Sequence, residues 1–217
     1  MKHLTAKEKE AEAFEKMKTN FHYKNPMAAP KIKKIVVNVG TGTAVKKDKN
    51  KNETIADRLA KITGQKAALR GAKKSIASFK VRQGEPIGLV VTVRGKRMYA
   101  FLEKLINVAI PRTKDFRGIT KKAVDNVGNL TLGIKEHTIF PETADEDIKD
   151  VFGMSITLVS TAKTKEEGTA FFELLGIPFK KQEDVKEFQK KEKKKRKRKP
   201  KTESVLVAPA AAPKAAA

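Results

Sequence analysis

The sequence has no cysteine, no tryptophan and comparatively few acidic side chains. Without cysteine, disulfide bonds and thiolate metal sites are excluded. No apolar run approaches the ~20 residues that cross a bilayer, and Met1 to Glu15 is charged throughout, without the apolar core of a signal peptide. We therefore expect a cytoplasmic protein with no membrane segment.

What the sequence has instead is positive charge. Its 217 residues carry 48 Lys and Arg against 25 Asp and Glu, a formal net charge of +23. Such a charge repels itself in a compact chain, so a polyanionic partner is expected. Nucleic acid is the first candidate and an anionic membrane surface the second.

The composition divides the chain into two parts. Residues 183–217 hold 12 basic and 5 acidic side chains, a net of +7, which leaves 36 minus 20, or +16, on residues 1–182. The second part runs from a cationic stretch, Lys190 to Lys199, into an Ala/Pro-rich end and has no apolar periodicity. We predict a folded domain over 1–182 and a disordered tail over 183–217.

Helical and strand patterns are mixed within 1–182. Capping boxes at Thr5–Glu8 and Thr164–Glu167 predict two helix starts, and an amphipathic pattern from Met98 to Ala109 predicts a helix that ends at Pro111. A third helix is predicted around Ile55 to Ile62, with a stop at Gly64. Alternating apolar residues predict four strands: 32–39, 87–94, 130–135 and 155–159. This pattern predicts an α+β fold, an antiparallel or mixed sheet with helices on one face.

The opposite face of that sheet is predicted to be polar and free of acidic residues. A solvated antiparallel face is polar in any case, so the pattern alone leaves its role open. Short donors and acceptors without carboxylates would suit the shallow minor groove of A-form RNA. Its members are Asn38, Thr92, Arg94, Thr131, Lys135, Ser155 and Thr157.

Signals for catalysis or metal binding are weak. Gly40 and Gly42 follow a strand, but the third glycine of a nucleotide-binding loop is missing. The histidines are scattered, and the acidic residues of 142–150 read as a solvated loop and helix start. We expect no catalytic residue, no metal and no cofactor.

The segment from Lys73 to Lys122 has 13 basic residues against 3 acidic ones. Phe79 lies among its cations and suits either stacking on a nucleotide or packing in a strand. Several motifs occur in order along the chain: Asn38-Val-Gly-x-Gly, Ile62-Thr-Gly-Gln-Lys66, Ala72-Lys-Lys-Ser-Ile-Ala-Ser-Phe-Lys-Val-Arg-Gln-Gly84, Pro86-Ile-Gly88, Pro111-Arg-x-x-Asp-Phe-Arg-Gly118, Phe140-Pro-Glu142 and Thr161-Ala-Lys163.

Together these motifs resemble the bacterial form of large-subunit ribosomal protein five, from about Leu4 to Lys181. The resemblance implies an α+β fold, a place in the central protuberance and no enzymatic activity. It also implies 5S ribosomal RNA as partner, with 23S ribosomal RNA and neighbouring protuberance proteins around it. The implied 5S-binding residues are Asn38, Gln65, Thr92 and Arg94.

The resemblance implies two further contact regions. A hairpin reaching the peptidyl-site transfer RNA corresponds to Ser75, Phe79, Lys80, Arg82 and Gln83. A surface facing small-subunit ribosomal protein thirteen corresponds to Arg112, Asp115, Phe116 and Arg117.

Two other classes of function stay open from the residues alone. A generic basic compactor of nucleic acid would bind with a steep salt dependence and no preference for 5S RNA. An RNA-modifying or nucleotide-hydrolysing enzyme would depend on Gly40 or Gly42 for turnover.

Overall fold

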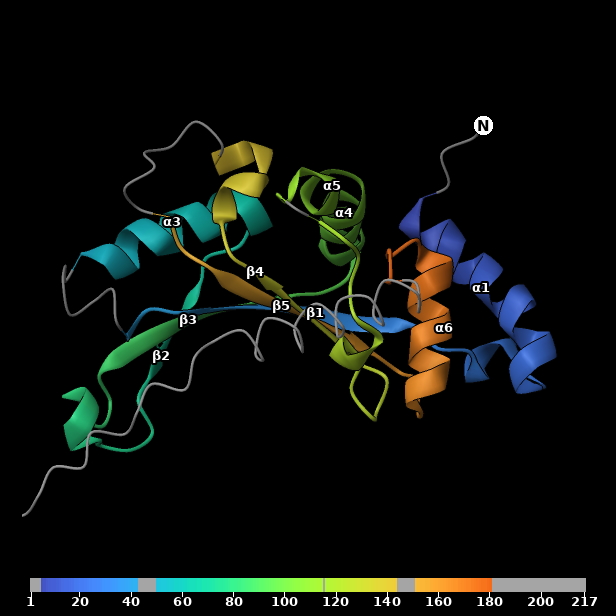
Figure 1. Cartoon of the computed structure of the whole chain (residues 1–217), viewed down its shortest axis with the longest axis horizontal. Coiled ribbons are helices and arrows are strands. Elements are labelled where there is room, and N and C mark those ends of the chain that lie inside the picture. Colours follow the sequence, from blue (N-terminus) through green and yellow to red (C-terminus); the bar gives the residue numbers. More distant parts are fainter. Residues whose placement is uncertain (1–4, 43–49, 115, 144–150, 181–217) are drawn as a thin grey trace, which may run out of the picture. The chain divides into compact units, whose positions relative to one another are not determined.

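The centre of the molecule is a five-stranded antiparallel sheet (Figure 1). The structure, a computed structural model, describes residues 5–42, 50–114, 116–143 and 151–180. The strand order of the sheet is β2-β3-β1-β5-β4, and every neighbouring pair is antiparallel. The sheet and its helices confirm the predicted α+β fold. The strands are β1 (Ile32–Gly40), β2 (Ala68–Gly71), β3 (Pro86–Val93), β4 (Leu130–Ile134) and β5 (Met154–Ser160).

Strict alternation of side chains gives the sheet one buried and one open face. Ile35 on β1 stands opposite Val93 on β3 and Leu158 on β5, and all three are at most 1% exposed. Their neighbours in sequence point the other way and are more exposed. Because side chains alternate along a strand, this register fixes which residues reach the open face.

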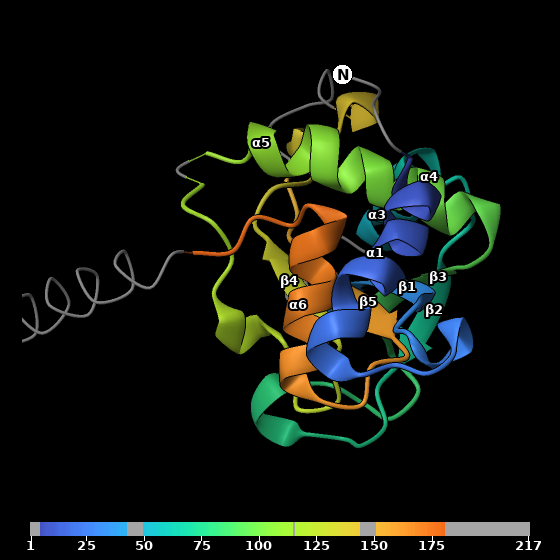
Figure 2. The ribbon, with the colours of Figure 1, turned by 90° about the vertical axis from the view of Figure 1, so that its right-hand side faces the viewer.

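The helices are α1 (Ala6–Phe21), α3 (Lys51–Thr63), α4 (Lys96–Lys104), α5 (Ile110–Arg112) and α6 (Lys165–Leu175). Helices α3, α4 and α5 cover one face of the sheet, while α1 and α6 lie side by side at one end of it (Figures 1 and 2). Between these layers lies a continuous apolar core that includes Phe101, Phe140, Phe171 and Phe172.

Local signals in the sequence set several helix ends. At α1 the capping box is complete: Thr5 N–H donates to Glu8 Oε2 (2.8 Å) and Glu8 N–H donates to Thr5 Oγ1 (3.4 Å). Helix α3 ends at Gly64, whose φ of +69° lies in the left-handed region. At α6 half of the predicted box forms, because the Glu167 carboxylate accepts from Lys163 N–H (2.8 Å) and not from Thr164.

The predicted helix end at Pro111 is wrong. After α4 the chain continues through a π-helical turn, Leu105–Ala109, into α5, which contains Pro111. A proline ring inside a helix collides with the carbonyl four residues earlier. The wider π turn makes room for the ring, so the helix passes the proline by one residue.

Two tyrosines connect helices to the rest of the body. Tyr99 O–H on α4 donates to Glu10 Oε2 on α1 (3.1 Å), and Tyr23 O–H donates to the Glu167 carboxylate on α6. Burial, followed by the charge of Glu10, raises the pKa of Tyr99 to about 12. Burial likewise raises the pKa of Glu10. Burial also raises the pKa of Tyr23, so both phenols are protonated donors at neutral pH.

Candidate RNA interface

The open face of the sheet is free of carboxylates. None of the five strands contains Asp or Glu. Asn38 on β1 lies between Val90 on β3 and Ser155 on β5, and Gly133 on β4 extends the same row. A Cβ added at Gly133 would meet no heavy atom within 4 Å, so a partner can approach this part of the sheet closely.

A second row crosses the same face. It runs from Thr92 on β3 to Val36 on β1, then to Thr157 on β5 and Thr131 on β4. The hydroxyls of Thr131 and Thr157 are 3.2 Å apart and bond to each other. Asn38 and Thr92 are diagonal neighbours in these two rows. No described residue bonds to either side chain, so both are available to a partner.

The other two predicted members of the site lie at one end of this face. Arg94 directly follows β3 and is exposed. Gln65 is exposed in the turn between α3 and β2, and because β2 runs antiparallel to β3, this turn lies beside the end of β3. The fold therefore brings Gln65 and Arg94 to the same end of the sheet, next to Thr92.

Two cations of the open face were missed from the sequence. Arg70 belongs to β2, a strand that was not predicted, and stands in register with Gly88 and Gly40. Lys34 lies on the open face by alternation with Val36 and Asn38, and the β1–β5 register shifts only before it, where Lys33 is the extra residue. A four-residue edge strand leaves no signal in hydrophobic periodicity, whereas alternation along the predicted strand 32–39 could have indicated Lys34.

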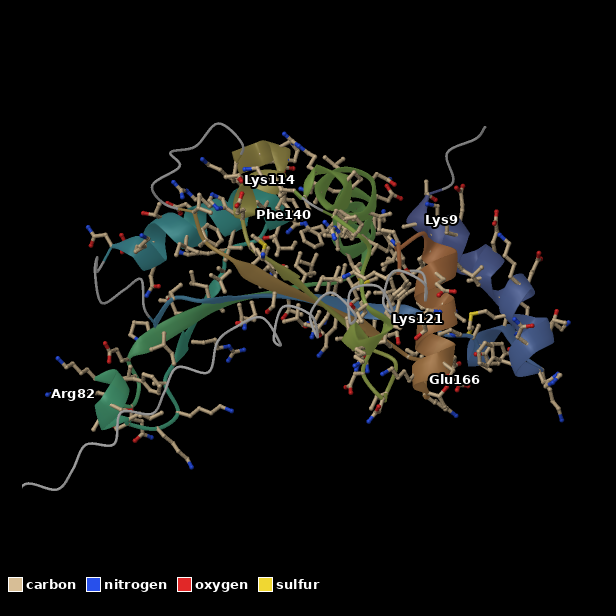
Figure 3. The ribbon with its side chains drawn as sticks, viewed as in Figure 1. Lys9, Arg82, Lys114, Lys121, Phe140 and Glu166 are labelled. Carbon is tan, nitrogen blue, oxygen red and sulfur yellow. The ribbon has the colours of Figure 1, made fainter. Side chains whose placement is uncertain are left out.

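The predicted hairpin is a closed loop at the outer edge of the sheet. Ile76 and Val81 exchange backbone hydrogen bonds (3.0 and 3.3 Å), and Ser75 Oγ accepts from Gln83 N–H (3.0 Å). Phe79 is 63% exposed, so it is a surface residue and not a core residue. Figure 3 shows Arg82 pointing away from the body at this end of the molecule.

Lys80 at the tip of the hairpin has φ +49°, one of two non-glycine residues in the left-handed region among those that the structure describes. Its N–H donates to Ala77 O (3.0 Å) and closes a short 3₁₀ turn. Asn or Gly suits this conformation better than Lys.

The surface predicted to face the small subunit follows α5. Arg112, Phe116 and Arg117 are all exposed, with 37% of Phe116 accessible. Asp115 lies outside the described residues. The segment is fixed at its far end, because Ile119 N–H donates to Pro178 O and Lys180 N–H donates to Ile119 O (both 2.8 Å).

Within the described part of the chain, no group of His, Asp and Glu side chains is placed to hold a metal ion. No described helix is long and apolar enough to cross a membrane. Of the acidic residues of 142–150, Glu142 lies within the described part, where it pairs with Lys104 (2.6 Å). The rest of that group lies outside it.

The chain is an α+β domain in which helices cover one face of the sheet. The other face is open, cationic, polar and free of carboxylates, features typical of an RNA-binding protein. Comparison with known families agrees. Residues 25–82 match the family model described as ribosomal protein L5, and residues 86–179 match the separate model that describes the C-terminus of the same ribosomal family.

Curated relatives extend this match over most of the chain. The large ribosomal subunit protein uL5 of Dictyoglomus turgidum is 54% identical over 165 residues, which cover 76% of this chain and 92% of the relative. That of Trichlorobacter lovleyi is 49% identical over 169 residues, covering 78% and 94%. That of Acaryochloris marina is 48% identical over 168 residues, covering 77% and 92%.

The chain belongs to the uL5 family of large ribosomal subunit proteins. It is accordingly a structural ribosomal protein and not an enzyme, and its place is the ribosome in the cytoplasm. Both family models end before residue 180.

Proposed function

We propose that the open sheet face binds 5S ribosomal RNA and thereby fixes the protein in the central protuberance, against 23S ribosomal RNA and neighbouring proteins. Asn38, Gln65, Thr92 and Arg94 supply the specific hydrogen bonds to ribose hydroxyls and base edges. The surrounding Lys and Arg residues neutralise phosphates.

One observation carries this proposal. Asn38 and Thr92 are diagonal neighbours on a carboxylate-free face, Gln65 and Arg94 are exposed at the end of that face next to Thr92, and none of the four side chains has a hydrogen-bond partner among the described residues. On binding, these groups exchange bonds to water for bonds to the RNA, and removal of one of them leaves the RNA group that it bonded unpaired in the interface.

The test is a pair of single substitutions, Asn38→Ala and Thr92→Ala, titrated against 5S RNA and a scrambled duplex. Each should weaken 5S binding by about 1–3 kcal/mol, because the RNA group that it bonded is left unpaired. The slope of affinity against salt should stay the same, since no phosphate contact is removed. Wild-type affinity in both variants would remove this face from the 5S site.

A control away from this face is Thr169→Ala on α6, which removes a hydroxyl that donates to Lys165 O (2.8 Å) within the helix. Its 5S affinity should stay close to wild type. A generic compactor would bind 5S RNA and the scrambled duplex equally well before any substitution, so the wild-type titration separates the two functions.

The hairpin and the segment after α5 complete the proposed role. Lys80 and Arg82, with Ser75, Phe79 and Gln83 around them, meet the backbone of the peptidyl-site transfer RNA. Cations suit this contact, because every transfer RNA must be accepted and phosphates carry no sequence. Arg112, Phe116 and Arg117, with Asp115, face small-subunit ribosomal protein thirteen.

A further inference from the structure

A dense group of cations lies where β3 ends and α4 begins. From residue 58 to residue 102 the chain has eleven basic side chains and one acidic side chain, Glu85. The Glu85 carboxylate is used at the base of the hairpin, where it accepts from Arg82 N–H (3.0 Å). Little negative charge is therefore left in this region to balance its cations.

The fold gathers some of these cations from two separate segments. Arg97 Nη1 donates to Gly64 O (3.2 Å), which holds the start of α4 against the turn that ends α3. Lys66 follows that turn and Lys96 opens α4, and both are exposed. With Arg94, they form what we call the β3-end cluster: Lys66, Arg94, Lys96 and Arg97.

Internal stability explains part of this cluster. Arg97 and Lys104 donate to the carbonyls of Gly64 and Ile62, which lie at the negative end of α3. Lys66 and Lys96 have no such role, since no described residue bonds to or pairs with either. Lys96 also stands in the first turn of α4, the positive end of a helix, where a cation is unfavourable.

The surface beside the cluster is concave. A hollow of about 260 Å³ lies between the last turn of α3 and the first turns of α4, and Lys61, Arg97 and Lys104 line it. Arg94 borders the open sheet face on one side and the start of α4 on the other. A backbone lying on that face can therefore continue round the end of β3 towards this hollow.

We propose that the RNA bound on the open face continues past the end of β3, and that Lys66, Lys96 and Arg97 bind phosphates of its backbone there. This inference rests on the proposed function and extends the RNA-binding surface beyond the sheet. The ligand is the phosphate backbone of A-form RNA, which either 5S or 23S ribosomal RNA supplies.

The experiment uses the full chain with Lys66→Gln and Lys96→Gln combined, which leaves the Arg97–Gly64 hydrogen bond in place. Losing two phosphate contacts should reduce the slope of log affinity against log salt by about 1.4–1.8. The loss of affinity should consequently be roughly tenfold greater at 0.05 M than at 0.2 M salt. The matched control, Lys18→Gln with Lys24→Gln, removes equal charge from exposed positions at the end of α1 and should keep a slope closer to wild type.

A second measurement is hydroxyl-radical footprinting of large subunits reconstituted with each double variant. Loss of protection on 5S or on 23S nucleotides shows which of the two RNAs supplies the bound phosphates. An unchanged slope with an unchanged footprint overturns the inference, and so does an equal fall in slope in both pairs. Failure of the proposed function itself shows differently, as a wild-type protein that does not prefer 5S RNA over a scrambled duplex.

Discussion

Individual residues of the RNA face differ in how far the sequence predicts them. Alternation along a strand places Asn38 and Thr92 on the polar face, and the register confirms both. Gln65 lies outside any strand, and only the resemblance to a known family indicated it. Its position beside Arg94 depends on how the chain turns from α3 into β2, which no local pattern encodes.

A close contact between the backbones at Gly168 and Gly128 predicts how a substitution there changes the stability of the fold. Gly168 on α6 lies against Gly128, so that a Cβ added at Gly168 would stand 2.6 Å from Gly128 Cα and 2.8 Å from its carbonyl oxygen. Alanine normally stabilises a helix interior by about 1 kcal/mol relative to glycine. Here the clash is with backbone, and Gly168→Ala should instead lower the free energy of unfolding by about 1–3 kcal/mol.

The measurement is denaturant unfolding of the two glycine variants Gly168→Ala and Gly133→Ala. Gly133 lies in β4 with no heavy atom within 4 Å of an added Cβ, so its variant should stay within about 0.5 kcal/mol of wild type. A Gly168→Ala protein as stable as wild type would show that α6 can move away from the 128 turn without cost.

At the scale of elements, the length of a strand decides whether the sequence predicts it. Strands β1, β3 and β5 show clear alternation and were predicted within one or two residues of their bounds. Strand β2 has four residues, all exposed, and is a strand because it pairs with β3. The π turn before Pro111 likewise depends on packing, since Leu105 and Ala109 are buried in the core.

The hairpin is the element whose proposed role calls for its own test. Lys80→Asn with Arg82→Gln removes both charges and keeps a residue suited to the left-handed backbone at position 80. Two exposed phosphate contacts contribute together about 1 kcal/mol, so peptidyl-site transfer RNA should dissociate roughly fivefold faster from purified ribosomes carrying the change.

Binding to 5S RNA, stability and incorporation into the subunit should be unaffected, because neither side chain lies on the open sheet face. Ribosomes with Lys18→Gln and Lys24→Gln serve as the charge-matched control and should release transfer RNA at the wild-type rate. Equal rates in both variants would show that the hairpin charges do not hold transfer RNA, and a loss of 5S affinity in the hairpin variant would assign the hairpin to the 5S site.

For the whole molecule, composition predicted the partner class better than it predicted the binding site. An excess of 23 positive charges predicts a polyanionic partner, but it does not indicate which surface of the protein binds it. The fold answers that by placing helices over one face of the sheet and leaving the carboxylate-free face open (Figure 1). Segments as distant as 34–38, 65–70 and 92–97 become one surface only through strand pairing.

Residues 183–217 lie outside the described residues and beyond both family models. Their basic composition predicts that they raise the affinity for any RNA, whatever its nucleotide sequence. Ending the chain after Lys181 should leave the fold intact, because Phe179 and Lys180 keep their pairing with Ile119. Removing a net charge of +7, counted above, should weaken binding to 5S RNA and to a scrambled duplex by similar factors, and more at low salt. Titrations of both proteins against both RNAs at two salt concentrations measure this. Discrimination between the RNAs resides in the open face and should survive the truncation. If it is lost instead, the tail itself distinguishes 5S RNA, and the division between a reading face and an electrostatic tail is wrong.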